Sequence, residues 1–210
     1  MGHGSQERKG EHEKFVLNTP STAPTDQVKV VVTLSGDVIS HADINLKLPR
    51  PGGGKDLYCN SSIREDAPWQ LQQVQDSVNH LNEALSLIRT SKTDFESGTE
   101  LTNFLTRIMT SVTRSRNSLI NPRKKTLDEL RSSKQVRSLQ PPIPTEVVLS
   151  FYLSGWKLLL AVYHIVVDPK TNVSKFNRYQ AECVIPWVNE VLLLLTVALQ
   201  SSQQLKDKVR

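Results

Sequence analysis

The sequence predicts a mainly helical α+β protein, in which an antiparallel four-helix bundle is joined to a small antiparallel β module. The stretch from Val184 to Val209 is apolar on every side in its middle, which is typical of a helix surrounded by other helices. Three further segments carry apolar residues at alternating steps of three and four. Residues 28–34 and 44–48 alternate with a period of two, as strands with one buried face do.

Length and composition indicate a soluble protein with one sizeable core. The chain has 210 residues, of which 38% are hydrophobic and 22% charged, as in ordinary globular domains. No secretory signal is visible, and two cysteines fit a cytoplasmic protein with free thiols. The apolar run in the last helix is too short to cross a bilayer, so we predict no transmembrane segment. Residues 1–14, polar and without periodicity, are predicted to be a disordered tail.

Residues 15–64 are predicted to form the β module. Apolar residues alternate with polar ones from Val28 to Leu34 and from Ile44 to Leu48, and Pro49 ends the second strand. A weaker third strand covers residues 57–63. Part of residues 170–182 is expected to join this module through a strand-like piece at 176–179.

Residues 65–210 are predicted to form the helical bundle. The first helix follows Asp66, and its apolar residues fall on one heptad stripe: Leu71, Val74, Val78, Leu81, Leu85 and Ile88. The second helix opens at residues 97–99 and stops before Pro122, and a short helix is expected at Leu127 to Ser132.

The third and fourth helices complete the predicted bundle. Thr145 can cap a third helix that Pro169 ends, and its apolar stripe again steps by three and four: Leu149, Tyr152, Trp156, Leu159, Tyr163 and Val166. Pro186 opens the last helix, which is predicted to lie at the centre of the bundle. An intermolecular zipper is the alternative, but apolar residues off the heptad seam favour packing within one chain.

Catalytic, cofactor and metal sites are not predicted. The five histidines show no metal-ligand spacing, and Cys183 lies among apolar neighbours with no base nearby in sequence to lower its pKa. No Gly-x-Ser-x-Gly motif is present. We therefore expect a protein that is not an enzyme and has no small-molecule substrate.

One basic segment is the candidate interaction patch. Residues 107–137 hold nine Lys or Arg against two acidic residues, a local charge of +7 in a chain whose formal net charge is +5. The patch residues that we single out are Arg114, Arg116, Arg123, Lys124 and Lys125. They could contact nucleic-acid phosphates or an anionic membrane, but the segment lacks aromatic residues for base stacking. A solvated linker is the favoured interpretation, so nucleic acid is not the expected partner.

Several ordered blocks of the sequence resemble the Rogdi family. The matching blocks are Asp26–Leu34, Ala42–Arg50, Arg64–Asp66 with Trp69, Glu182–Trp187 and Gln203–Lys208, and the match runs from about Phe15 to Val209. The resemblance implies a helical bundle with a small β module, and an adaptor related to the small subunit of the RAVE complex. That complex assembles the vacuolar-type proton ATPase, so the implied partners are a large RAVE-type scaffold protein and peripheral ATPase subunits.

The resemblance also implies a location and a structural consequence. The protein is expected in the cytoplasm, either free or peripheral on vesicles, such as synaptic vesicles, or at the nuclear envelope. The alternative function is a basic protein associated with nucleic acid or with the nuclear envelope. Family members begin with an additional helix that this chain lacks, so we expect apolar surface to be left exposed on the bundle. That surface could bind a partner's amphipathic helix or a second copy.

Overall fold

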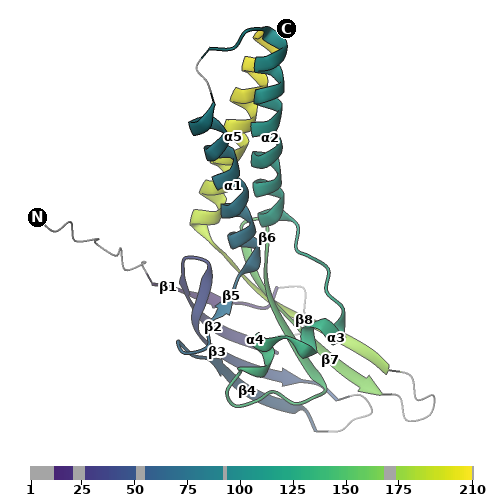
Figure 1. Cartoon of the computed structure of the whole chain (residues 1–210). Helices are drawn as coiled ribbons and strands as arrows, with labels where there is room; N and C mark the ends of the chain where they lie inside the picture. Colours follow the sequence, from purple (N-terminus) through teal and green to yellow (C-terminus); the bar gives the residue numbers. More distant parts are fainter. Residues whose placement is uncertain (1–11, 21–26, 51–54, 92–93, 168–173, 210) are drawn as a thin grey trace, which may run out of the picture. The chain divides into compact units, whose positions relative to one another are not determined.

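The computed structural model describes residues 12–20, 27–50, 55–91, 94–167 and 174–209, which form two compact units. The sheet unit comprises the described residues of the ranges 1–70, 127–149 and 161–181, and the helical unit comprises those of the ranges 71–126, 150–160 and 182–210. Residues 1–11 of the predicted tail lie outside the described residues, whereas Glu13 and Lys14 belong to the first strand. The described residues form eight strands and five helices (Figure 1).

The predicted mainly helical four-helix bundle is wrong. The helices are α1 (Gln72–Thr90), α2 (Gly98–Ile120), α3 (Leu127–Ser132), α4 (Lys134–Arg137) and α5 (Pro186–Val209), and only α1, α2 and α5 are long. The predicted third helix is instead a pair of strands, β6 (Val147–Ser154) and β7 (Lys157–Val167). With β8 (Ser174–Val184) they form a three-stranded sheet in the order β6-β7-β8. The short helix expected at Leu127 to Ser132 is confirmed.

The helix prediction failed at residues 145–167 because both faces of these strands are buried. Three consecutive residues are buried at the start of β6, Val147 to Leu149, and five in the middle of β7, Leu158 to Val162. In these runs apolar residues do not alternate with polar ones, so the sequence shows no period of two. A continuous apolar run fits a buried strand as well as a buried helix. The discriminating signals are the many β-branched and aromatic residues and the glycine between the strands, Gly155.

Gly155 makes the turn from β6 to β7 with a φ of 61°, in the left-handed region. A residue with a side chain is destabilised by about 1–2 kcal/mol in this conformation. Within a helix, in contrast, replacing glycine by alanine is stabilising by about 1 kcal/mol. We therefore expect Gly155→Ala to lower the free energy of unfolding, measured by urea titration. Stabilisation by this substitution would instead support the discarded helix over residues 145–167.

The sheet unit contains a five-stranded antiparallel sheet. Its strands run in the order β1-β2-β3-β4, with β5 also paired to β3: β1 (Glu13–Leu17), β2 (Val28–Ser35), β3 (Val38–Leu48), β4 (Leu57–Ile63) and β5 (Trp69–Gln70). Alternate residues of β2 and β3 are buried, which confirms the strands predicted there. The main chain of Ser62 on β4 exchanges hydrogen bonds with that of Gln140, at 2.8 and 3.1 Å.

The helical unit is built on α2, which packs against α1 on one side and α5 on another (Figure 1). Small residues bring α1 and α2 together: Ala84, Ser111 and Ser115 are buried, and the hydroxyls of Ser77 and Ser115 lie 2.8 Å apart in a hydrogen bond. The first residue of α2, Gly98, lies close to Val209 at the end of α5, so these two helices run antiparallel. Among the described residues, no comparable contact joins α1 to α5.

Apolar side chains of α1 and α5 that the sequence analysis predicted to be buried are exposed in this arrangement. The heptad residues Val78, Leu85 and Ile88 of α1 are 42–51% exposed. The buried residues of α1 are Val74, which belongs to the heptad, and Ser77 and Ala84, which do not. On α5, packing buries Val188, Leu192 and Leu195 only. The last helix is therefore not the surrounded centre of a bundle, and both α1 and α5 present apolar side chains to solvent.

Candidate interaction surface

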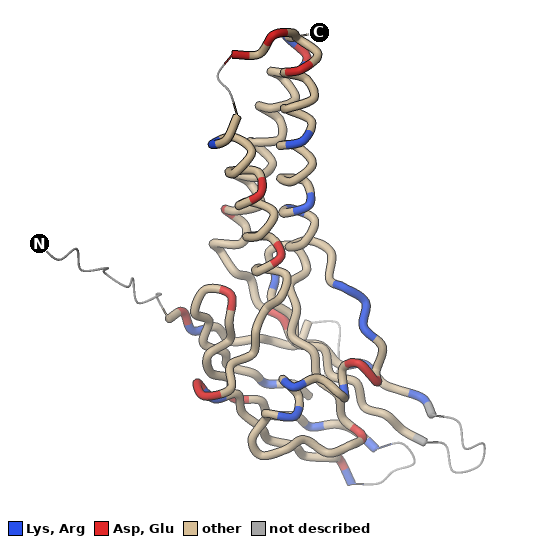
Figure 2. The backbone as a smooth tube through the Cα atoms, viewed as in Figure 1, with Lys and Arg blue, Asp and Glu red and all other residues tan. Residues whose placement is uncertain are grey.

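The basic residues singled out from the sequence lie on the second half of α2 and on the connection that follows it. That connection is a continuous basic stretch (Figure 2). Arg114 is exposed on α2, and Lys124 and Lys125 are exposed after it. None of these three forms an ion pair with another residue that the structure describes, so their charges are available to an acidic partner.

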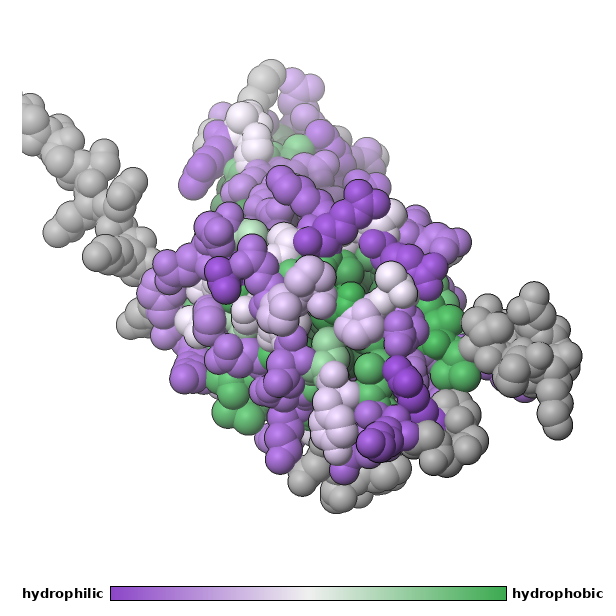
Figure 3. Space-filling model, turned by 90° about the horizontal axis from the view of Figure 1, so that it is seen from below, coloured by the Kyte–Doolittle hydropathy of each residue, from purple (hydrophilic) through white to green (hydrophobic). Residues whose placement is uncertain are grey.

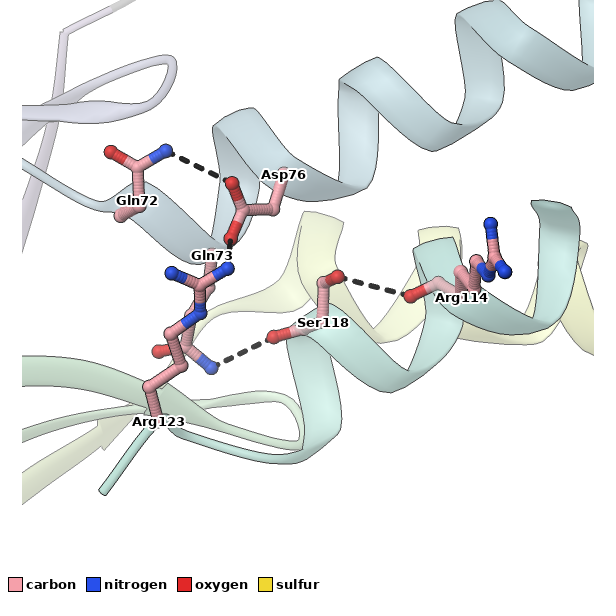
Figure 4. A network of polar contacts seen from close by, with 6 residues as sticks. All are labelled: Gln72, Gln73, Asp76, Arg114, Ser118 and Arg123. Carbon is pink, nitrogen blue, oxygen red and sulfur yellow. Dashed lines mark hydrogen bonds and ion pairs between the residues drawn. The ribbon is translucent and has the colours of Figure 1, made fainter.

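The two remaining patch residues make contacts inside the helical unit. The Arg116 Nε donates a hydrogen bond to the Thr196 hydroxyl at 3.2 Å, which links α2 to α5. The Arg123 guanidinium lies 3.5 Å from the Asp76 carboxylate on α1, and Asp76 also accepts a hydrogen bond from Gln72 (Figure 4). Arg116 thus also links α2 to α5, and Arg123 links the connection after α2 to α1.

Gln73 is a polar clamp that the sequence did not reveal. Its amide nitrogen donates to the carbonyl oxygens of Ser118 on α2, at 2.9 Å, and of Leu153 on β6, at 3.0 Å. Its amide oxygen accepts the main-chain N–H of Leu153 at 2.8 Å. The Ser118 hydroxyl in turn donates to the Arg114 carbonyl at 3.0 Å (Figure 4). One side chain thus joins α1, α2 and β6 beside the basic residues, and only the three-dimensional structure could identify it.

Exposed apolar side chains are concentrated on the helical unit. On α1 they are Val78, Leu85 and Ile88, and on α5 they are Leu193, Leu194, Val197 and Leu205, with exposed fractions of 42–68%. On the face seen in Figure 3, apolar side chains show in separate places between hydrophilic ones. Four of these exposed side chains lie on α5, more than on any other element among the described residues, which makes α5 a candidate for protein contacts.

The two cysteines are poor nucleophiles in this fold. Burial raises the pKa of the Cys183 thiol to about 11, and the nearby Glu182 carboxylate adds to the effect. Burial also raises the pKa of Cys59, with a further contribution from Glu146. Both thiols are therefore protonated at neutral pH, and thiols react as thiolates.

His164 on β7 is a second buried titratable group of the sheet unit, besides Cys59. It is 3% exposed, and its Nδ1 has no hydrogen-bond partner among the described residues. Burial lowers its pKa, Glu146 partly opposes that shift, and Arg50 reinforces it. Arg50 and Glu146 are themselves 3.6 Å apart in an ion pair. His164 is therefore neutral in the folded chain at physiological pH.

Stability should fall on acidification because of this histidine. The unfolded chain takes up a proton at His164 near pH 6.5, whereas the folded chain does so only at lower pH, so the parent loses stability below about pH 6.5. His164→Phe removes that contribution. Relative to the parent, the variant should therefore gain stability as the pH falls from 7.5 to 5.5, measured by denaturant unfolding. A parallel pH dependence of the two proteins would contradict this prediction.

Metal-binding and membrane-spanning features are not found in the described residues. No group of three or more His, Cys, Asp or Glu side chains is placed to hold a metal ion there. No described helix is long and apolar enough to span a bilayer. Taken together, the fold and the surface define a two-unit α+β protein whose helical unit exposes apolar and basic side chains.

The chain belongs to the Rogdi family. The family model described as Rogdi leucine zipper containing protein matches residues 5–210. The chain is 40% identical to Protein rogdi of Drosophila melanogaster over 199 residues, which cover 94% of this chain and 71% of the fly protein. It is 34% identical to Protein rogdi homolog of Homo sapiens over 224 residues, or 94% of this chain and 76% of the human protein. The Caenorhabditis elegans homolog is 31% identical over 211 residues, or 93% of this chain and 70% of the worm protein.

Proposed function

We propose that the chain is a non-enzymatic adaptor or scaffold subunit in the assembly or regulation of the vacuolar-type proton ATPase, within a RAVE-like complex. The observation behind this proposal is the family match over residues 5–210, because the resemblance relates Rogdi proteins to the small RAVE subunit. The proposed partners are a large RAVE-type scaffold protein and peripheral ATPase subunits. The proposed location is the cytoplasm, with peripheral association to vesicles or the nuclear envelope.

Two kinds of surface support an adaptor. The exposed apolar side chains of α1 and α5 offer area that a partner could desolvate, which is the main source of binding free energy at interfaces. The exposed Arg114, Lys124 and Lys125 offer positive charge that would speed association with an acidic surface. We propose that these charges steer the partner and that the apolar side chains hold it.

Affinity purification of the tagged chain followed by mass spectrometry tests the proposal. We expect recovery of a RAVE-type scaffold and peripheral ATPase subunits, with weaker recovery for Lys124→Glu/Lys125→Glu. The matched control is Arg131→Glu/Arg137→Glu, which makes the same change in charge at exposed residues outside the patch. If both variants recover the ATPase subunits as well as the parent does, the basic residues take no part in partner binding. If the parent recovers no ATPase or RAVE subunit, the proposed function is wrong.

The alternative function, a basic protein associated with nucleic acid or the nuclear envelope, is favoured only by the exposed basic residues. It predicts recovery of nucleic acid that decreases steeply with salt, because each phosphate contact releases counterions. Nucleic acid retained in low salt and lost on Lys124→Glu/Lys125→Glu would support this alternative over the adaptor.

A further inference from the structure

Two threonines of this chain follow an arginine by three residues, and they lie in different kinds of structure. Thr110 follows Arg107 within α2, and Thr126 follows Arg123 in the connection between α2 and α3. No other Ser or Thr in the sequence has Arg or Lys at that spacing. Two lysines also stand between Arg123 and Thr126, so Thr126 directly follows three basic residues.

A basic residue shortly before a hydroxyl is the pattern that basophilic protein kinases select, because carboxylates in their substrate groove pair with it. Such a kinase must also hold the hydroxyl oxygen in line with the γ-phosphorus of ATP and beside its catalytic aspartate. The substrate segment therefore has to lie extended in the groove. Both the charges before a threonine and the local backbone decide whether it can be modified.

The local backbone separates the two threonines. Residues 122–126 belong to no helix or strand, and each residue from Asn121 to Thr126 is exposed. Thr110 lies inside α2, and its hydroxyl donates a hydrogen bond to the Thr106 carbonyl at 2.8 Å. A kinase would have to unwind α2 to extend the chain around Thr110, although α2 packs against both α1 and α5. Of the two threonines, Thr126 is therefore the one that a kinase can reach.

The basic residues before Thr126 are available for recognition. Lys124 and Lys125 are exposed and form no ion pair with another residue that the structure describes. The Arg123 guanidinium lies 3.5 Å from the Asp76 carboxylate, but the Arg123 side chain is 77% exposed. An ion pair with so exposed a partner is weak, so Arg123 can exchange it for carboxylates of a kinase.

We propose that Thr126 is a phosphorylation site for a Ser/Thr kinase that recognises Arg123, Lys124 and Lys125. In the reaction a bond forms between the Thr126 Oγ1 and the γ-phosphorus of ATP, and the bond from that phosphorus to the β–γ bridging oxygen breaks. ADP leaves, and the hydroxyl proton passes to the catalytic aspartate of the kinase.

The phosphate reverses the sign of the local charge. Residues 123–129 hold three positive and two negative side chains, a net charge of +1. A phosphate adds about two negative charges at neutral pH, so the same segment then carries about −1. Phosphorylation would thus repel an acidic partner that the basic residues attract. This last consequence rests on the proposed function, whereas the modification of Thr126 does not.

Incubation of the purified full chain with ATP and the catalytic subunit of cyclic-AMP-dependent protein kinase tests the site, and tandem mass spectrometry locates the phosphate. We expect phosphate on Thr126, none after Thr126→Val, and parent incorporation after Thr110→Val. Lys124→Glu/Lys125→Glu should lower kcat/KM by more than about tenfold, because it replaces attraction by repulsion. Arg131→Glu/Arg137→Glu, with the same change in charge elsewhere, should be modified as the parent is, and circular dichroism verifies the fold of each variant.

A second kinase tests which side of Thr126 is recognised. Asp128 and Glu129 follow Thr126, and casein kinase II selects acidic residues after the hydroxyl. We expect it to modify Thr126 more slowly than the first kinase does. Faster modification by casein kinase II, preference for Thr110, or equal rates for Lys124→Glu/Lys125→Glu and the parent would overturn the proposal. Because the assay contains no ATPase subunit, its result is separate from that of the proposed function.

The charge reversal is measured on immobilised polyglutamate, a model of an acidic surface. The phosphorylated chain should elute at lower salt than the unmodified chain, and Thr126→Val treated with the kinase should elute as the unmodified chain does. Elution of the phosphorylated and unmodified chains at the same salt concentration would contradict an effect of the phosphate on the basic residues.

Discussion

Leu192→Asp should unfold the helical unit, whereas Leu193→Asp, one residue further along the same helix, should leave it folded. Leu192 is 8% exposed in the contact of α5 with α2, and Leu193 is 59% exposed. An unpaired carboxylate in an apolar contact costs several kcal/mol, out of a total stability of about 5–15 kcal/mol. Leu193→Asp adds a charge in solvent and should change stability by less than about 0.5 kcal/mol.

Circular dichroism during thermal unfolding measures both variants. We expect the helical signal of Leu192→Asp to be reduced or to melt without a cooperative transition, and that of Leu193→Asp to match the parent. Equal melting temperatures for the two variants would contradict the packing of α5 described above, since the two side chains differ mainly in the side of the helix on which they lie.

Gln73→Glu should destabilise the protein at neutral pH and recover as the pH is lowered. The parent amide donates to two carbonyl oxygens, those of Ser118 and Leu153, and a carboxylate can only repel them. Its other oxygen still accepts the Leu153 N–H. Breaking such a clamp costs about 2–4 kcal/mol, because partly buried acceptors lose their donor and face a charge.

The pH dependence distinguishes the clamp from general damage to the fold. The glutamate must bind a proton to donate to one of the two carbonyl oxygens, so its folded pKa lies above its unfolded value of about 4.3. Relative to the parent, the variant should therefore regain stability as the pH falls through that raised pKa. Gln73→Leu, which cannot donate at any pH, is the matched control, and urea titrations from pH 7 to pH 4 measure both. A gap between Gln73→Glu and the parent that does not narrow with acid would exclude the clamp.

The sequence was sufficient to predict helices and strands that have one buried face and one face in solvent. The alternation in β2 and β3 indicated strands, and the turn and capping residues around α2 indicated its start and stop: the hydroxyl of Ser97 accepts the main-chain N–H of Glu100, and the helix ends before Asn121. It failed where strands are buried on both faces, as in β6 and β7, since periodicity then carries no information.

The helix faces could not be deduced from hydrophobicity alone. On α1 the heptad residues suggested a core stripe, yet Val78, Leu85 and Ile88 are exposed, and the small Ser77, outside the heptad, is buried and hydrogen-bonded to Ser115 of α2. The basic residues were placed on the correct segment, but pattern analysis could not show that Arg116 and Arg123 contact Thr196 and Asp76. Such contacts join residues far apart in the chain, and nothing local encodes them.

The division of the chain between the two units has a consequence for synthesis. The helical unit draws on residues 71–126, 150–160 and 182–210, and the sheet unit on the segments between them, with β6, β7 and β8 each contributing to both. No contiguous fragment therefore contains the helical unit alone. During translation, α1 and α2 leave the ribosome long before α5. Until α5 has been synthesised, the side of α2 that α5 covers in the folded chain stays exposed. In that interval the nascent chain is open to chaperones and to misassociation.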